Sequence, residues 1–332
     1  MGEFDLIAHY FKRPVRRAAL GVGDDCALLQ PKADTQLAIS SDMLVLGRHF
    51  LADVDPRTLG HKALAVNLSD LAACGAKPLA FTLALSLPHV DEAWLAAFSQ
   101  GLLALADAHG CELIGGDTTA GPLNICITVF GEVPVTRGQS QALLRSGAQA
   151  GDDLYVSGTL GDARLALDAL LGKLKLPDDL LARARTRLET PTPRVALGLA
   201  LRGVASSAID ISDGLLGDLG HVLQSSGVGA TVMADIATEL IAARAYLTGA
   251  TGQFGINLSN EQWRTLALAG GDDYELLFTA PPALQGAVAA AAQASQTPVT
   301  RIGQIHATPG LQLLDRHGQT LENHYASFDH FA

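Results

Sequence analysis

The sequence is poor in cysteine and carries none of the short signatures of the common nucleotide-binding and hydrolase families. Its four cysteines, Cys26, Cys74, Cys111 and Cys126, lie far apart and form no C-x-x-C pair. This spacing argues against a thiolate zinc site, and a chain of this length does not suggest a disulfide framework. The patterns G-x-x-x-x-G-K-[ST], G-x-G-x-x-G, H-E-x-x-H and G-x-S-x-G are also absent. If the protein binds a nucleotide, it therefore does so without a P-loop or a dinucleotide-binding fingerprint.

Long apolar runs are missing as well. No uninterrupted apolar segment reaches the ~18 residues that a membrane helix requires, because Asp, Lys or Pro interrupts each candidate. The first residues show no basic stretch followed by an apolar one, so the sequence predicts no secretory signal. We therefore expect a cytoplasmic protein with no membrane partner.

Positive charge is scarce. Lys and Arg number 23 against 34 Asp and Glu, which gives a formal net charge of −11. Because nucleic acids require a basic binding face, we expect no nucleic-acid partner. An acidic protein can still act on phosphates if its carboxylates hold cations that neutralise the phosphate charge.

Apolar residues, by contrast, are plentiful: they make up 48% of the 332 residues and are dominated by Ala and Leu. This composition favours helices packed on sheets, and the length predicts two domains. Runs typical of strands and helices alternate in both halves, whereas residues 134–150 lack a clear period. We predict domains over residues 1–148 and 149–332, both of mixed α and β structure.

Acidic residues beside Gly or Ser recur at predicted strand ends and helix starts. Any one such segment is an ordinary turn or helix cap. Together they offer hard oxygen ligands of the kind that Mg²⁺ prefers, and glycine lets backbone N–H groups approach a phosphate. Converging carboxylates would repel one another without cations, so the set predicts Mg²⁺-dependent phosphate chemistry. The segments cover residues 23–25, 40–42, 67–70, 115–117, 210–214, 218 and 270–273.

The same segments, in their order and spacing, resemble the thiamine-monophosphate kinase family. The resemblance implies ATP-dependent phosphorylation of thiamine monophosphate to thiamine diphosphate with several Mg²⁺ ions. It also implies the two-domain fold shared with aminoimidazole-ribonucleotide synthetase, in which an N-terminal α/β domain forms a homodimer and a C-terminal α+β domain follows. The similarity covers nearly the whole chain, and its motifs occupy residues 21–27, 39–45, 47–50, 65–73, 115–119, 211–215, 270–276 and both ends of the sequence.

This resemblance further implies roles for individual residues. The implied metal ligands are Asp25, Ser40, Ser41, Asp42, Asp70, Asp117, Asp210 and Asp213. The implied nucleotide contacts are Gly116, Asp117, Arg145 and Ser212. The implied contacts to the thiamine side are His49, Asp272 and Phe328. Two positions depart from the family pattern, since Asp272 stands where Glu is usual and Phe328 where Tyr or Trp is usual.

Structural roles compete with these functional ones. His49 alone is typical of a hydrogen-bonded structural histidine, and Arg145 of a solvated surface charge. Asp24 is a candidate cap for its own turn, and Phe328 a candidate core residue.

The implied acceptor is itself a phosphate monoester, whose second pKa of about 6 leaves it anionic near neutral pH. Such an acceptor needs no strong general base, so we expect direct in-line transfer without a catalytic nucleophile. Two alternatives stay open: another enzyme of the superfamily, such as aminoimidazole-ribonucleotide synthetase or selenophosphate synthetase, and a nonenzymatic ATP or metal sensor. Selenophosphate synthetase would require a reactive Cys with a nearby Lys close to the N-terminus, and Cys26 follows Asp25 with no glycine-rich arm before it.

Overall fold

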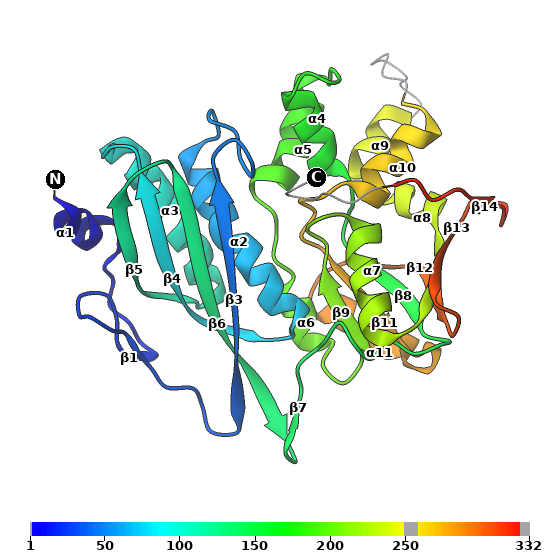
Figure 1. Ribbon diagram of the computed structural model, residues 1–332, viewed down its shortest axis with the longest axis horizontal. Coiled ribbons are helices and arrows are strands. Elements are labelled where there is room, and N and C mark those ends of the chain that lie inside the picture. Colours follow the sequence, from blue (N-terminus) through cyan, green and yellow to red (C-terminus); the bar gives the residue numbers. More distant parts are fainter. Residues whose placement is uncertain (1, 249–257, 326–332) are drawn as a thin grey trace. The chain divides into compact units, whose positions relative to one another are not determined.

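The computed structural model describes residues 2–248 and 258–325, which fall into two compact units (Figure 1). The first unit comprises Met1–Leu71 and Ala76–Ala142, and the second comprises Ala72–Gly75 and Leu143–Ala332. Both contain helices and sheets, as the composition predicts. In the described ranges no helix is long and apolar enough to cross a membrane.

The first unit is built on a sheet with the strand order β3-β6-β4-β5. Strands β4 and β5 run parallel, whereas β6 is antiparallel to both β3 and β4. The short strand β7 (Gln139–Ser140) extends β6, and β1 (Ala18–Leu20) pairs with β2 (Leu28–Leu29) in a separate ribbon. The main strands are β3 (Thr35–Val45), β4 (Lys77–Leu87), β5 (Glu112–Ala120) and β6 (Asn124–Thr136).

Two long helices, α2 (Pro56–Ala73) and α3 (Glu92–His109), lie against one face of this sheet (Figure 1). Both begin at an aspartate cap, of which the Asp55-Pro56 pair predicts the first. Asp55 accepts the Arg57 N–H at 2.7 Å, and Asp91 accepts the Ala93 N–H at 3.0 Å. The helices approach each other at glycine, because a side chain at Gly60 would come within 2.1 Å of the Phe98 carbonyl oxygen. This close contact fixes α2, which carries part of the candidate site.

The other face of β3 is apolar and exposed. Because side chains alternate along a strand, Leu37, Ile39 and Met43 share this face, where they are 40%, 60% and 52% exposed. Ser40, Asp42 and Leu44 point instead toward α2. The strand therefore separates an acidic, helix-facing side from an apolar outer side.

The N-terminal segment is helical, as its periodicity predicts, and consists of α1 (Glu3–Leu6) and the π-helical η1 (Ile7–Phe11). Its buried side chains are Leu6 and Phe11, whereas Phe4 is 82% exposed. The periodicity of residues 3–11 predicts one helix with Phe4 and Phe11 on a common face, but Phe4 does not share the burial of Phe11. The change from α to π geometry within the segment rotates its second half, so one helical period does not describe both parts.

The second unit contains a sheet with the strand order β14-β13-β10-β12-β8-β11-β9. Its central strands are antiparallel, and within this sheet β10 and β13 form the one parallel pair among the described strands. The strands are β8 (Asp153–Ser157), β9 (Ser207–Asp210), β10 (Gly229–Met233), β11 (Leu276–Ala280), β12 (Val299–His306), β13 (Gly310–Leu314) and β14 (Thr320–Leu321).

Helices pack on this sheet around a core that includes Leu154, Ile209, Leu219, Leu268 and Ile302. The sequence pattern predicts strands over residues 153–157, 207–211, 230–234 and 299–305, and β8, β9, β10 and β12 confirm them to within one residue. The strand predicted over residues 274–279 is β11, which begins two residues later. The helices are α4 (Asp162–Leu170), α5 (Asp178–Glu189), α6 (Val195–Ala200), α7 (Leu215–Ser226), α8 (Ala234–Glu239), α9 (Ala242–Thr248), α10 (Asn260–Ala269), η2 (Pro282–Leu284) and α11 (Gln285–Ala294).

Candidate functional site

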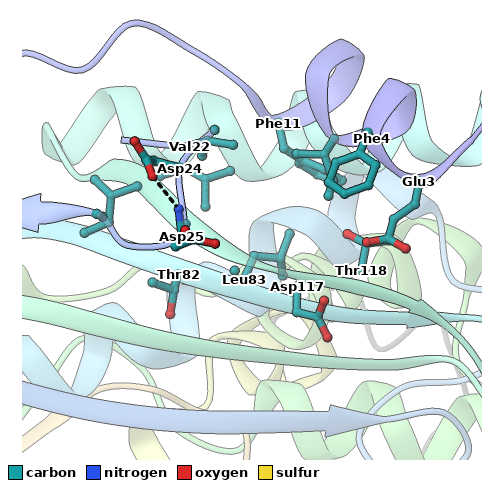
Figure 2. A pocket seen from close by; sticks show the side chains of 17 residues that line it. Glu3, Phe4, Phe11, Val22, Asp24, Asp25, Thr82, Leu83, Asp117 and Thr118 are labelled. Atoms are coloured by element: carbon teal, nitrogen blue, oxygen red, sulfur yellow. Dashed lines mark hydrogen bonds between the residues drawn. The ribbon is translucent and has the colours of Figure 1, made fainter. Parts of the chain in front are cut away.

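A cavity of about 650 Å³ lies in the first unit between the N-terminal helices, the turn that precedes β2, and strands β4 and β5. Figure 2 shows Glu3, Phe4 and Phe11 on one side of it and Asp24 and Asp25 on the other. Gly116 and Asp117, on β5, line it as well. Three predicted site residues, Asp25, Gly116 and Asp117, are thus brought to one cavity.

The cavity is acidic at its polar positions and apolar elsewhere. Glu3, Asp24, Asp25 and Asp117 contribute carboxylates, while none of the described residues that line it is Lys, Arg or His. These carboxylates would repel an anionic ligand unless it entered together with cations. The exposed ring of Phe4 provides a flat apolar surface at the opposite side.

Local structure explains two residues of this cavity. The Asp25 N–H donates to Asp24 Oδ1 at 2.9 Å, so Asp24 caps its own turn, as the structural alternative supposes. Gly116 has φ 145°, and a side chain there would lie 1.8 Å from the Leu83 carbonyl oxygen. Only glycine therefore permits β5 to pair with β4 at the point where Asp117 follows.

A second group of site residues lies between β3 and α2. Ser40 Oγ donates a short hydrogen bond to Asp70 Oδ2, and the Asp42 N–H donates to Asn67 Oδ1 at 3.1 Å. Asn67 is in turn held by its amide, which donates to the Ala63 carbonyl at 3.0 Å. The three-residue spacing of Asn67 and Asp70 puts both on the face of α2 that meets the strand.

Ser41 is not part of this group. Its hydroxyl lies on the outer face of β3, where it donates to the Ile127 carbonyl at 3.1 Å and lies 3.0 Å from Thr128 Oγ1. The alternation of a strand forces this separation, since neighbours along the chain point to opposite faces. The structure therefore places Ser40 and Asp42 on the side of β3 that meets α2 and leaves the Ser41 hydroxyl on the other side of the sheet.

His49 closes the turn after β3. The Val45 N–H donates to His49 Nδ1 at 3.0 Å, and Lys62 Nζ donates to the His49 carbonyl oxygen at 3.4 Å. Because Nδ1 accepts, the neutral ring carries its proton on Nε2. The imidazole thus has a structural role in the turn through Nδ1, and its Nε2–H is the ring's hydrogen-bond donor.

In the second unit, β9 ends at Asp210, and the turn that follows carries Ser212 and Asp213. Asp210 is buried, at 6% exposure, and pairs with Leu276 of β11. Asp218 Oδ2 accepts the N–H groups of Ser212, Asp213 and Gly214 at 3.0, 3.2 and 3.2 Å. We expected glycine-flanked segments to offer their N–H groups to phosphate, and that expectation is wrong for this turn. Its N–H groups are directed at a carboxylate of the same chain.

The carboxyl group of Asp218 is only 3% exposed. Burial, followed by repulsion from Asp213, raises its pKa to about 7, although the three backbone N–H groups act in the opposite direction. The sequence shows this aspartate five positions after Asp213 but gives no direct sign of its partners. Asp218 lies in helix α7, whereas the N–H groups that it accepts belong to residues before the helix.

The segment 270–276 packs directly against that turn. The Asp272 N–H donates to the Ser212 carbonyl at 2.9 Å, and the Tyr274 N–H donates to the Ile211 carbonyl at 2.8 Å. Asp272 and Tyr274 both have left-handed backbone conformations, with φ values of 65° and 49°. Such conformations strain residues other than glycine and are found at functional sites. Tyr274 donates from its hydroxyl to Asp272 Oδ1 at 3.4 Å, so both side chains lie on the same side of the segment.

The alternate residues of this segment are anchored in the interior. Asp273 is 1% exposed, and its two carboxylate oxygens accept the Gly161 N–H at 2.9 and 3.1 Å. Burial raises the pKa of Asp273 well above its usual range, against the attraction of Arg187. The strained residues therefore flank a fixed, buried carboxyl group.

Glu275 is fully buried and ionically paired. It accepts hydrogen bonds from Ser157 Oγ at 2.6 Å, Arg187 Nη2 at 2.7 Å and Arg194 Nε at 2.6 Å. The sequence shows Glu275 as part of the 270–276 motif and gives no sign of its pairing with the two arginines. A buried acid in a motif is a signal for basic partners, but partners more than 80 positions away cannot be identified from one sequence.

Two further predicted residues receive less support from geometry. Arg145 is exposed, and its carbonyl oxygen accepts a hydrogen bond from Ser226 Oγ at 3.2 Å. Phe328 lies outside the described residues.

The candidate metal ligands all offer oxygen atoms, and this donor chemistry fits Mg²⁺. Their arrangement is dispersed, however: among residues 2–248 and 258–325, no three His, Cys, Asp or Glu side chains are grouped so that they could hold a metal ion. The structure instead shows three acidic groups, which are the cavity, the contact between β3 and α2, and the turn after β9.

Comparisons with known proteins agree along the whole chain. The family described as AIR synthase related protein, N-terminal domain, matches residues 23–133, and its C-terminal domain matches residues 149–316. Thiamine-monophosphate kinase from Salmonella typhimurium is 46% identical over 100% of this chain and 98% of its own length.

Solved structures show the same relationship. Thiamine-monophosphate kinase from Stenotrophomonas maltophilia K279a superimposes with a TM-score of 0.80 and 45% identity, covering 96% of each chain. AaThiL complexed with AMPPCP and TMP superimposes with a TM-score of 0.75 and 28% identity, covering 91% of this chain and 89% of that one.

Proposed function

The chain belongs to the thiamine-monophosphate kinase family, and from this premise we propose that it transfers the γ-phosphoryl group of ATP to thiamine monophosphate, with release of ADP and thiamine diphosphate. It is a kinase with the two-domain AIR synthase-like fold that the sequence motifs imply. The observation that carries the proposal is 46% identity over the entire chain to a curated enzyme of this activity. The complex of AaThiL with AMPPCP, an ATP analogue, and TMP supports the same pair of substrates.

The cavity of the first unit is the place proposed for the nucleotide. Its volume of about 650 Å³ falls within the range of small-molecule sites. The phosphates would lie at the end that carries Asp25, Gly116 and Asp117, where metal ions offset the carboxylate charge. The base would lie against the apolar wall of Phe4, because aromatic side chains stack on nucleobases without a sequence-specific contact.

Magnesium is proposed as the cation. When bound, Mg²⁺ would neutralise the triphosphate and the charge that develops during transfer. The protein's own contribution is to hold hard oxygen donors in fixed positions, as Ser40, Asp42 and Asp70 are held between β3 and α2. The other proposed donors are Asp25, Asp117, Asp210 and Asp213, whereas the Ser41 hydroxyl lies on the outer face of β3 and is not proposed as a donor.

Transfer is proposed to be direct. The acceptor oxygen of a phosphate monoester is already anionic near neutral pH, so the residues of the site need only position the two phosphates and exclude water. A phosphorylated side chain should therefore not accumulate. Rapid acid quench with γ-labelled ATP checks this step, and label bound covalently to the protein during turnover would overturn it.

The thiamine side is proposed to contact His49, Asp272 and Phe328. A carboxylate suits the permanently cationic thiazolium ring. Asp272 stands where the family usually has Glu, and its strained backbone, with φ 65°, fixes the direction of the shorter side chain. Replacement of Asp272 by Glu is therefore expected to retain activity, whereas replacement by Asn should weaken binding of thiamine monophosphate.

A homodimer formed through the outer face of β3 is proposed as the assembly. Leu37, Ile39 and Met43 make an exposed apolar stripe on this edge strand, and such a stripe is stabilised when a second copy covers it. Light scattering is expected to give twice the mass of the chain. Ile39→Lys should give the mass of a single chain, and an unchanged dimer would contradict this interface.

The proposed activity is tested by incubating the purified chain with ATP, Mg²⁺ and thiamine monophosphate and separating the products. Thiamine diphosphate and ADP in equal amounts are expected. Free thiamine in place of thiamine monophosphate provides the control for the acceptor, since it lacks the phosphate that is to be phosphorylated. Binding of ATP and Mg²⁺ without product would instead favour a sensor that has kept the family's fold.

A further inference from the structure

The turn that carries Ser212 and Asp213 has no regular secondary structure of its own, and a single buried carboxylate determines its conformation. Asp218 Oδ2 accepts three successive N–H groups, from Ser212, Asp213 and Gly214, at 3.0 to 3.2 Å. Three donors on one oxygen fix the peptide planes on both sides of Asp213. The direction in which the Ser212 and Asp213 side chains leave the backbone follows from those planes.

This arrangement differs from an ordinary helix cap. A capping side chain precedes its helix and satisfies N–H groups within the first turn. Asp218 instead lies inside α7, which begins at Leu215, and reaches backward to residues that precede the helix. Its own N–H donates to the Gly214 carbonyl at 3.0 Å. The carboxylate therefore orders the turn as far as Gly214, the N-cap of α7.

The same contacts extend to the segment proposed for the thiamine side. The Ser212 carbonyl, whose own N–H is held by Asp218, accepts the Asp272 N–H at 2.9 Å. The backbone at Gly271 lies so close to Ser212 that a side chain at Gly271 would come within 2.5 Å of the Ser212 carbonyl oxygen. Displacement of Ser212 would therefore displace Asp272.

From this geometry we propose that Asp218 is a positioning residue for the phosphoryl transfer. It touches neither substrate; it fixes Ser212 and Asp213 on the nucleotide side and, through the Ser212 carbonyl, Asp272 on the thiamine side. The inference rests on the proposed function and adds to it a residue that acts on both candidate substrate contacts of the second unit. Productive alignment of two phosphates is sensitive to shifts of about 1 Å, so the loss of this carboxylate affects the reaction more than the fold.

The test uses two substitutions and a matched control in the full-length chain. In Asp218→Ala the three N–H groups lose their acceptor, and kcat for thiamine diphosphate formation is expected to fall by about 100-fold. In Asp218→Asn an amide oxygen still accepts, so kcat is expected to stay within about tenfold of the unsubstituted chain. The control is Asp162→Ala, because Asp162 is equally buried and accepts the N–H groups of Ala242 and Ala243 at the start of α9.

All kcat values are normalised to folded protein, and amide hydrogen exchange supplies a readout that does not depend on turnover. Peptides covering residues 211–217 and 270–274 are expected to exchange faster in Asp218→Ala and to remain protected in Asp162→Ala. Asp162→Ala is expected to keep kcat per folded molecule within about twofold, since its carboxylate accepts from the start of α9 and its loss should act mainly on stability.

Full activity of Asp218→Ala per folded molecule would overturn the inference while leaving the kinase activity in place. An equal loss in Asp162→Ala would also overturn it, since the effect would then be a general one on the fold. An unsubstituted chain that forms no thiamine diphosphate would refute the proposed function, and the positioning role with it.

Discussion

At the scale of single residues, the candidate ligands differ in how firmly the chain holds them. Ser40, Asp42 and Asp70 are tied to each other or to Asn67 across the contact between β3 and α2. Asp117 lies in the cavity after a glycine that no other residue can replace. Both groups thus have fixed donors before any cation arrives, which lowers the ordering cost of binding.

The carboxylates of Asp42 and Asp117 are expected to be required for Mg²⁺-dependent turnover. Asp42→Asn and Asp117→Asn each remove a charged oxygen donor and should lower kcat by roughly 10²- to 10³-fold, the usual range for loss of one electrostatic contact in a transition state. Steady-state kinetics over a range of Mg²⁺ concentrations measure the effect. Asp107→Asn, which breaks an exposed pair with Arg13, is the control and should be near normal.

The cysteines offer an independent check of burial. Cys26 is exposed, whereas burial of Cys111 raises the pKa of its thiol to about 12. Because the thiolate is the reactive species, iodoacetamide at pH 8 is expected to label Cys26 and to spare Cys111, which stays protonated below its pKa. Peptide mass spectrometry measures the labelling, with urea-unfolded protein as the control in which both react. Rapid labelling of Cys111 in the folded chain would contradict the packing of this unit.

What the sequence reveals at this scale depends on the distance between partners. Asp55 and Asp91 are predictable as helix caps, because their partners lie two or three positions away. The contacts of Asp218 and Glu275 are not predictable, since one reaches backward into a turn and the other pairs with arginines from another helix and loop. The opposite directions of Ser40 and Ser41 follow from strand alternation once β3 is recognised.

At the scale of elements, the N-terminal helical segment contributes both to the core, through Leu6 and Phe11, and to the wall of the cavity, through Glu3 and Phe4. Its periodicity predicts a helix, but the exposure of Phe4, at 82%, shows that this ring is not used in the core. The sequence could not show this, because the segment changes from α to π geometry at Ile7. The ring is instead directed toward the cavity (Figure 2).

If Phe4 supports the base of ATP, its removal should weaken nucleotide binding selectively. Phe4→Ala is expected to raise KM for ATP roughly tenfold, the effect of losing about 1.4 kcal/mol of stacking, with KM for thiamine monophosphate unchanged. Leu28→Ala, at another exposed apolar side chain of the same unit, provides the control. An equal rise in KM for both substrates would show that the N-terminal segment does not act through the base.

At the scale of the whole molecule, buried charge sets much of the architecture of the second unit. Glu275, directly before β11, is fully buried. Arg187 of α5 and Arg194, which precedes α6, both form ion pairs with it. Removal of one partner from such a group leaves the others buried and unpaired, which is far more costly than loss of an exposed pair.

Glu275→Ala is therefore expected to lower the free energy of unfolding by about 3 to 5 kcal/mol in urea denaturation. Glu189→Ala is the matched control, because it breaks a pair with Arg185 on a single helix and should cost less than about 1 kcal/mol. A loss below about 1 kcal/mol for Glu275→Ala would show that the two arginines find other partners or solvent.

Across the chain, the sequence predicts which residues belong to the site better than it predicts how those residues are arranged in space. The net charge of −11 leads to the expectation of cations, and the motifs identify the family. In the structure the segments form three acidic groups, and among the described residues no three His, Cys, Asp or Glu side chains are grouped so that they could hold a metal ion. One sequence cannot reveal that dispersion, because spacing along the chain does not report which side of a sheet or which turn a carboxylate occupies.

The most direct test of the account follows the γ-phosphoryl group itself. With γ-labelled ATP, Mg²⁺ and thiamine monophosphate, the account predicts that the label appears in thiamine diphosphate in step with ADP, and that chelation of Mg²⁺ stops the transfer. Label that is released only as inorganic phosphate, or no consumption of ATP in the presence of thiamine monophosphate, would contradict it.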